Sequence, residues 1–179
     1  VRINGRAHHA HFAFNSLPPP LPSDPRYHNL LQHFLGWVIH TEEPRFDPQT
    51  ATLMDFRIAQ GAETRFVYVL PLDAHRALVE FTVFSGALLP KADYAHALRG
   101  YIEHDLKIDE FVIEHDEFGV IPMSDAPLAR QPSAHVMNIG TAGGASKPST
   151  GYTFLRTQRQ ARRIAQALRP LVLDDLLQK

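Results

Sequence analysis

Hydrophobic and polar positions alternate along the middle of the chain in runs of strand length. Turn-forming residues, chiefly Pro, Gly and Asp, separate these runs, and this pattern is typical of an antiparallel meander. The predicted strands span residues 10–15, 31–39, 51–58, 64–70 and 76–84. Two shorter strands are predicted over 111–115 and 119–122, and the apolar segment 134–139 predicts a last one.

Two other segments predict helices. The segment 92–106 places Ala95, Leu98, Tyr101 and Ile102 at helical spacing on one face. The segment 153–168 is rich in arginine, and Pro170 is expected to end or kink the helix there. A sheet of antiparallel strands flanked by helices predicts an α+β fold.

Composition narrows the classes of function. The 179 residues carry a formal net charge of −1, which argues against a general nucleic-acid binder because phosphate neutralisation needs a basic face. The chain has no cysteine, so disulfides, thiolate metal sites and cysteine nucleophiles are excluded, and its eleven histidines are scattered. No metal site is therefore predicted. The apolar runs are of strand length, well short of the ~20 residues that a membrane-spanning helix needs.

A glycine-rich loop lies between the last predicted strand and the second helix. It runs from Gly140 to Tyr152 and includes Gly143, Gly144 and a Pro-x-x-Gly step from Pro148 to Gly151. A strand, a glycine-rich loop and a helix in this order present backbone N–H groups to an anion. The loop does not have the spacing of a P-loop, and the chain contains no G-x-G-x-x-G fingerprint. The pattern leaves two interpretations open, a cofactor-binding loop and an ordinary flexible loop.

One carboxylate stands in the middle of an apolar strand. Alternation places Glu80 on the same face as Leu78, Thr82 and Phe84. A carboxyl in such surroundings has its pKa raised by desolvation and can serve as a general acid. The pattern taken alone favours a surface glutamate paired with Arg65 or Arg76.

An ordered set of short blocks resembles the bacterial lycopene beta-cyclases. The blocks are Gln32–Trp37, Leu53–Arg57, Phe66–Leu72, Ala77–Thr82, Gly119–Met123 and the loop Gly140–Tyr152. Their order and spacing match that family over most of the chain, from about Ala7 to Arg163. Two positions depart from the family pattern: Phe81 replaces an acidic residue, and Thr141 replaces an aspartate that related flavoproteins often have.

The resemblance implies a reaction and a cofactor. These enzymes use reduced flavin adenine dinucleotide (FAD) and cyclise the acyclic ends of lycopene without net oxidation. Their proposed acid corresponds to Glu80, and the resemblance overturns the surface interpretation of that residue. The second flavin-binding element of the family corresponds to Gly140, Gly143, Gly144, Pro148, Thr150 and Gly151.

The resemblance also implies a domain organisation. Residues 1–24 would end the FAD-binding region, residues 25–133 would form the substrate sheet, and residues 134–179 would form the second FAD-binding segment with its helix. The fold would then be the C-terminal part of a two-domain flavoprotein of the glutathione reductase and hydroxylase type. Because the nucleotide-binding fingerprint is absent, we expect a partial chain that binds flavin poorly and is inactive by itself.

Alternatives remain open at this point. A hydroxylase or reductase of the same fold would consume a reductant, and a carotenoid- or lipid-binding domain would leave Glu80 without a catalytic role. The arginines from Arg156 to Arg163 form either a solvated helix face or a contact with an anionic membrane. For a carotenoid enzyme we expect a cytoplasmic location with peripheral membrane contact.

Overall fold

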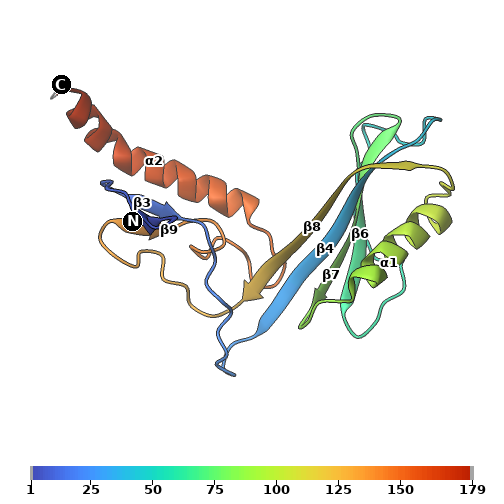
Figure 1. Ribbon diagram of the computed structural model, residues 1–179, viewed down its shortest axis with the longest axis horizontal. Helices are drawn as coiled ribbons and strands as arrows, with labels where there is room; N and C mark the ends of the chain where they lie inside the picture. The colour runs from blue at the N-terminus through green and yellow to red at the C-terminus, as the bar shows by residue number, and fades with distance from the viewer. Residues whose placement is uncertain (1, 178–179) are drawn as a thin grey trace. The chain divides into compact units, whose positions relative to one another are not determined.

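The structure, a computed structural model, describes residues 2–177, with side chains described as far as Arg169 (Figure 1). The chain forms two compact units, one made of residues 1–28 and 123–179 and the other of residues 29–122. The sequence-based division into segments 1–24, 25–133 and 134–179 assigns functions to parts of the chain, and it stays a prediction. The strands are β1 (Arg2–Ile3), β2 (Arg6–Ala7), β3 (Ala13–Asn15), β4 (Asn29–His40), β5 (Thr52–Asp55), β6 (Thr64–Pro71), β7 (Arg76–Ser85), β8 (Val112–Ser124) and β9 (Val136–Asn138). The helices are α1 (Lys91–His104) and α2 (Phe154–Leu177).

The larger sheet has five strands in the order β5-β6-β7-β4-β8. Strand β7 is central and pairs antiparallel with both neighbours, so Glu80 lies opposite Tyr68 of β6 and Gly36 of β4. The α+β class is confirmed, because helix α1 packs against a sheet whose resolved pairings are antiparallel (Figure 1).

The core lies between one face of this sheet and α1. Alternate residues of β6 and β7, among them Val67, Val79 and Phe81, are almost fully buried there. The helix contributes the positions that its spacing predicts: Leu98, Tyr101 and Ile102 are buried, with Tyr94 added at the start of the helix. Alternation therefore leaves the other face of the sheet, which carries Glu80, without this helix cover.

A buried carboxylate ties strand β5 to helix α1. The Tyr101 hydroxyl donates a hydrogen bond to Asp55 Oδ2 over 2.8 Å, and the Arg57 guanidinium lies 2.5 Å from the same oxygen. The hydrogen bonds from Arg57 hold the pKa of Asp55 well below its usual range, against the opposing effect of burial. Met54, just before it, has a φ of 54°, and the pairing register shifts there, so the strand predicted over 51–58 ends at Asp55.

A second predicted break does not occur. The strands expected over 111–115 and 119–122 are one strand, β8, which continues through Gly119. The ring of Phe34 occupies the space where a side chain at residue 119 would lie, since an added Cβ would come 2.2 Å from Phe34 Cζ. Pro122 is tolerated because β8 is an edge strand, where a missing N–H costs no ladder hydrogen bond.

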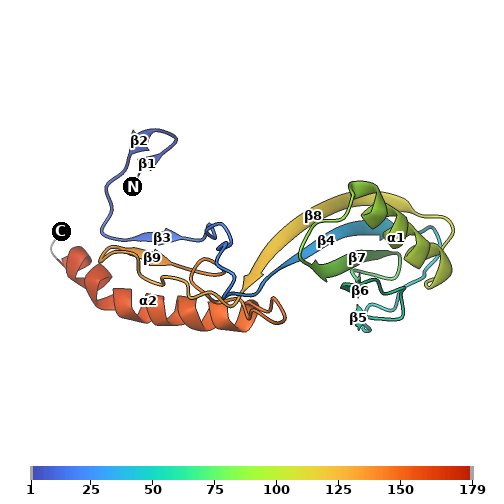
Figure 2. The same ribbon diagram turned by 90° about the horizontal axis from the view of Figure 1, so that it is seen from below.

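The smaller unit contains a parallel pair and the long helix. Strands β3 and β9 pair in parallel from Ala13 opposite Val136 to Asn15 opposite Asn138, and α2 runs alongside them (Figure 2). The strand predicted over 10–15 is thus shorter than expected. The sequence predicts that this helix ends or kinks at Pro170, and in the structure the helical segment continues beyond that residue to Leu177.

The hairpin β1–β2 was not predicted, although its signal is present in the sequence. Asn4 and Gly5 have φ values of 49° and 79°, the left-handed pair that an Asn-Gly turn supplies. Among the described residues no helix combines the length and the apolar character needed to cross a membrane.

The contact between Phe34 and Gly119 yields a prediction about stability. We expect Gly119→Ala to lower the free energy of unfolding by about 1–3 kcal/mol, because the new methyl overlaps the ring. The matched control is Gly100→Ala in α1, where nothing lies within 4 Å of an added Cβ. This control should raise stability by about 0.5–1 kcal/mol through helix propensity. Urea unfolding checks both values, and equal midpoints for the two variants would contradict the packing described here.

Candidate functional site

The face of the sheet opposite α1 carries a half-buried carboxyl among apolar and aromatic side chains. Tyr68, Leu78 and Phe34 project from β6, β7 and β4 on this face and are half-buried. Thr82, the next residue of β7 on the same face, is fully buried, and its hydroxyl donates a hydrogen bond to Glu80 Oε1 over 2.9 Å. The structure thus places the predicted acid on a surface that suits an apolar substrate.

The electrostatics of Glu80 favour its protonated form. Desolvation raises the pKa of the Glu80 carboxyl above its ordinary value, and the hydrogen bond from Thr82 opposes this rise. The nearby carboxylate of Glu117 raises the pKa further through its negative charge. Neither Arg65 nor Arg76 is its partner: Arg65 pairs with Glu63, and Arg76 pairs with Asp73 and, more loosely, with Glu114.

Glu117 is a site residue that the sequence did not single out. It lies on β8, 37 positions beyond Glu80. Alternation along β8 shows which residues share a face with Glu117 but not which face of the sheet that is. The register between β8 and β4 decides which face it takes, and no local pattern encodes that register.

The buried histidine of β4 has a structural role. His33 is fully buried, and its Nδ1 lies 2.7 Å from the Tyr94 hydroxyl while its Nε2 lies 2.8 Å from Ser85 Oγ. Burial lowers the pKa of His33, so the ring is neutral. Tyr94 accepts the Leu89 N–H, which leaves its own proton for Nδ1 and makes Nε2 the donor toward Ser85. Every polar atom of this ring is therefore satisfied inside the core.

The predicted flavin loop lies in the other unit and holds its own shape. Gly140, Gly144 and Gly151 have φ values of 58°, 72° and 69°, which residues with a side chain rarely adopt. Gly143 is required for a different reason, since an added Cβ would come 2.3 Å from the Asn138 carbonyl oxygen. The remaining predicted loop residues, Pro148 and Thr150, belong to the turn that closes on Lys147 through the Gly151 N–H.

One side chain of α2 fixes the loop to the helix. Gln160 accepts the Gly140 N–H over 3.0 Å and donates to the Asn138 carbonyl over 3.2 Å. Inside the loop, the hydroxyls of Thr141, Ser146 and Thr153 form a continuous chain with oxygen separations of 2.9 and 2.7 Å. The loop is thus preorganised at the first turn of α2.

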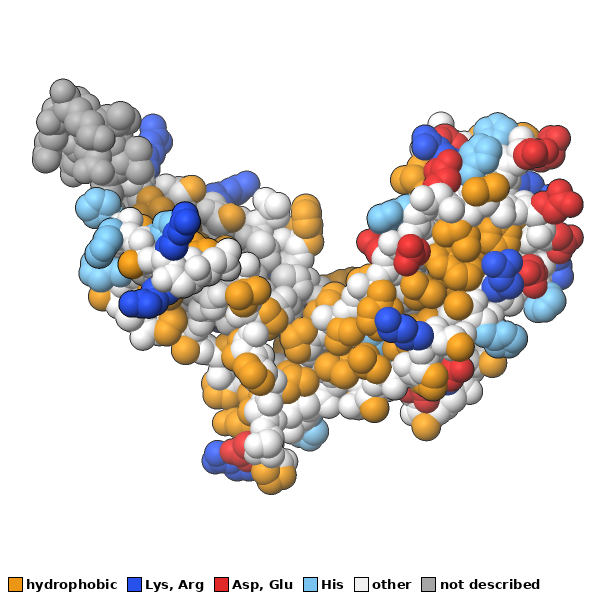
Figure 3. Space-filling model, viewed as in Figure 1, with side chains coloured by type: hydrophobic (Ala, Val, Ile, Leu, Met, Phe, Trp, Pro, Cys, Tyr) orange, Lys and Arg blue, Asp and Glu red, His pale blue; other side chains and the backbone are white. Residues whose placement is uncertain are grey.

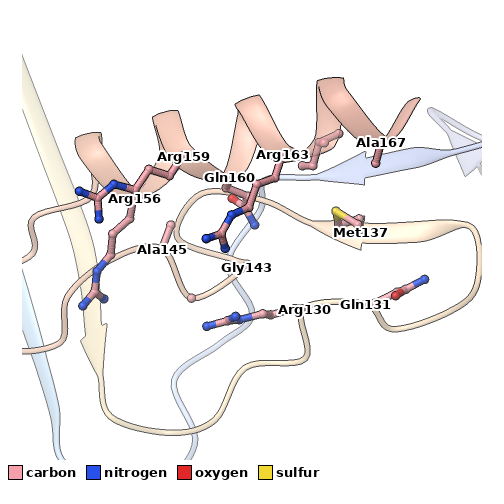
Figure 4. Close-up of a pocket in the computed structure, with 12 residues that line it drawn as sticks. Arg130, Gln131, Met137, Gly143, Ala145, Arg156, Arg159, Gln160, Arg163 and Ala167 are labelled. Atoms are coloured by element: carbon pink, nitrogen blue, oxygen red, sulfur yellow. The ribbon is translucent and has the colours of Figure 1, made fainter. Parts of the chain in front are cut away.

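Arginine side chains surround a cavity beside this loop. The cavity of about 580 Å³ is lined by Arg130, Arg156, Arg159 and Arg163, together with Gly143 and Gln160. Figure 4 shows Arg156 and Arg163 extending from α2 toward the segment that carries Arg130 and Gly143. No described carboxylate forms an ion pair with any of the four arginines.

Charge is divided between the two units. Residues 29–122 contain fifteen acidic and seven basic residues, whereas the remaining segments contain four and eleven. Figure 3 shows the acidic side chains gathered over the unit with the five-stranded sheet. The near-neutral net charge of the whole chain is therefore the sum of an acidic unit and a basic unit that contains α2.

The fold resembles that of a solved structure. A geranylgeranyl bacteriochlorophyll reductase-like protein from Thermoplasma acidophilum superposes with a TM-score of 0.57 over 81% of this chain and 35% of its own, at 15% identity. At that identity the likeness shows the fold alone.

Sequence comparison then gives the family. The lycopene cyclase family model matches residues 2–175, and the chain belongs to that family. Lycopene beta cyclase of Capsicum annuum is 31% identical over 159 residues, covering 82% of this chain and 30% of the relative. Neoxanthin synthase of Solanum tuberosum is 30% identical over 145 residues, covering 74% of this chain and 28% of the relative. The chain thus spans about 30% of the length of these relatives, so their complete activities do not transfer to it directly.

The raised pKa of Glu80 predicts a pH-dependent gain in stability when the charge is removed. A carboxyl whose pKa is higher in the folded state stabilises the fold at low pH, and stability is lost as pH rises through the folded pKa. We therefore expect Glu80→Gln to have a higher free energy of unfolding than the wild type at pH 8, by on the order of 1 kcal/mol, and to lose this advantage at pH 4. Urea unfolding at the two pH values measures both differences. The exposed Glu110→Gln serves as control and should shift little at either pH. A gain that is the same at both pH values would contradict the charge argument.

Proposed function

We propose that the protein containing this chain is a lycopene beta-cyclase, which converts the acyclic ends of lycopene to beta-ionone rings by acid catalysis. The observation that carries the proposal is the Glu80 carboxyl, which is half-buried, has its pKa raised by desolvation, and lies on a sheet face of aromatic and aliphatic side chains. Family membership supports the same substrate class, since relatives named lycopene beta cyclase match most of the chain.

The reaction needs one proton donor and a dry surface. Glu80 donates its proton to a terminal double bond of lycopene, whose π electrons form the new C–H bond and leave a carbocation. A second double bond of the same molecule attacks the cation and closes the ring, and loss of a proton restores a double bond. Electrons and atoms balance without an oxidant, so the step is an isomerisation. Thr82, which donates to Glu80, stabilises the carboxylate that the transfer produces.

The loop suits FAD, and its residues Gly140, Gly143, Gly144, Pro148, Thr150 and Gly151 would hold that cofactor. The fit rests on donor chemistry: the first turn of α2 directs N–H groups and its positive dipole end toward an anion such as a pyrophosphate. When bound and reduced, FAD supplies negative charge that stabilises a carbocation. The chain's own residues keep the loop in place through Gln160 and the three linked hydroxyls.

Peripheral membrane contact forms the second part of the proposal. Tyr152, just before α2, and Phe154 and Leu155 in its first turn are exposed by 62%, 72% and 66%. The arginines that follow on the helix stand three or four positions apart, where like charges repel by about 0.2–0.5 kcal/mol per pair. Anionic headgroups would relieve that repulsion while the apolar side chains enter the interface. We place this contact on the cytoplasmic side of a membrane that holds the carotene.

The membrane contact predicts binding to anionic vesicles. The purified protein should sediment with vesicles of phosphatidylglycerol and phosphatidylcholine more strongly than with phosphatidylcholine alone, and salt should weaken the binding. Arg156→Glu with Arg159→Glu should lower the partition coefficient about tenfold or more, since each basic residue near the surface contributes about 1 kcal/mol. Arg2→Glu with Arg6→Glu reverses the same amount of charge in the hairpin and should leave binding near the wild-type level. Equal losses in both double variants would show that only net charge matters and would refute a specific contact.

The cyclase assignment predicts the pigment of lycopene-accumulating cells. The complete reading frame should convert lycopene to a cyclic carotene, and Glu80→Gln should reduce conversion by at least about 100-fold, because general acid catalysis contributes 10²–10⁴. Flavin content of the purified variant should equal that of the wild type, which separates lost acid from lost cofactor. Unchanged ring formation in Glu80→Gln would reject the assigned acid, and full retention of lycopene by the wild type would reject the reaction.

A further inference from the structure

Strand β4 lies between β7, which carries Glu80, and β8, which carries Glu117, and it has a glycine, Gly36, between these two carboxyls. Gly36 of β4 lies directly opposite Glu80 of β7 in the antiparallel register. On its other side Gly36 meets β8, and a Cβ added to it would lie 3.2 Å from Glu117 Cγ and 3.4 Å from Glu117 Oε1. The Glu117 side chain therefore leans over the glycine toward Glu80.

The register of β8 supports this placement independently. Gly119, two residues further along β8, faces Phe34, which is two residues before Gly36 on β4. The two contacts run in opposite directions along the strands, as an antiparallel pair requires. Glu117 and Glu80 thus occupy the same face of the sheet, on strands separated only by β4.

The two carboxyls differ in their access to water. Glu80 is half-buried and borders the apolar face, whereas Glu117 is exposed on the edge strand. A proton can therefore reach Glu117 from solvent without crossing the substrate surface. The Glu117 carboxyl, which lies beside Gly36, the residue directly opposite Glu80, provides the next step of that path.

We propose that Glu117 is a positioning and proton-loading residue for Glu80, which it reaches across Gly36. This inference rests on the proposed function, in which Glu80 is the acid. After Glu80 has given its proton to the alkene, two carboxylates face each other and repel. Glu117 takes a proton from solvent and passes it to Glu80, so Glu80 is neutral again and Glu117 returns to its carboxylate. The proton that the cyclised cation loses returns to solvent, so the cycle neither gains nor loses protons.

Other titratable groups on this face are few. Tyr68 of β6 lies opposite Glu80, and His115 precedes Glu117 by two residues on β8. His40 of β4 also shares this face and lies opposite Arg76. On β7 itself Arg76 shares the face but is paired with Asp73. Glu117 is the carboxylate whose negative charge raises the pKa of Glu80.

The test uses a charge-neutral variant and reads two properties. In the complete protein with ¹³C-labelled glutamate carboxyls, Glu117→Gln should move the titration midpoint of Glu80 to lower pH, because the like charge is gone. The alkaline limb of the pH profile for ring formation should move in the same direction, and kcat at neutral pH should fall about tenfold, a modest share of a general acid's contribution. The matched control is Asp116→Asn, which removes a charge from the opposite face of the same strand and should change neither property.

The outcomes separate this inference from the proposed function. An unchanged Glu80 titration and pH profile in Glu117→Gln, with ring formation still lost in Glu80→Gln, would overturn the role of Glu117 alone. Full activity in Glu80→Gln would overturn the acid itself. If Glu117→Gln does not fold, Glu117→Asp decides: it retains the charge on a shorter side chain, and the proposal expects reduced kcat with the Glu80 midpoint still raised. A kcat equal to that of the wild type in this variant would contradict the relay.

Discussion

The alternation of strand β7 is the constraint on which the larger unit depends. As the central strand of five, β7 must bury Ala77, Val79, Phe81 and Val83 against α1. The same alternation turns Leu78, Glu80 and Thr82 to the opposite face. One strand thereby supplies both the core that holds the sheet together and the carboxyl that the proposed chemistry needs. A register slip of one residue would exchange the two faces and abolish both.

Phe81 illustrates this division. The family resemblance led us to regard it as a departure from the usual acidic residue, and its exposed fraction of 1% shows that it is a core side chain. An acidic residue at that position would need a buried partner. The carboxylate that does interact with Glu80 comes from β8 instead, across the space that Gly36 leaves open.

Local patterns predicted the elements well where tertiary contacts agree with them. Period-two alternation located β4, β6 and β7, and helical spacing located α1, nearly to the residue. The errors arose where distant residues decide the outcome. Phe34 fills the space beside Gly119 and keeps β8 continuous, and a shift in the pairing of β5 shortens that strand. Glu117 could not be assigned from the sequence because its partner depends on the pairing of β8 with β4.

In the proposed mechanism, ring closure begins with a proton from this chain and involves no net redox change. The most direct test is cyclisation in D₂O by the complete protein, with the carotene product analysed by mass spectrometry. The account predicts one deuterium for each ring formed and no stoichiometric consumption of reductant. Rings that carry no solvent deuterium, or one equivalent of reductant consumed per ring, would contradict it.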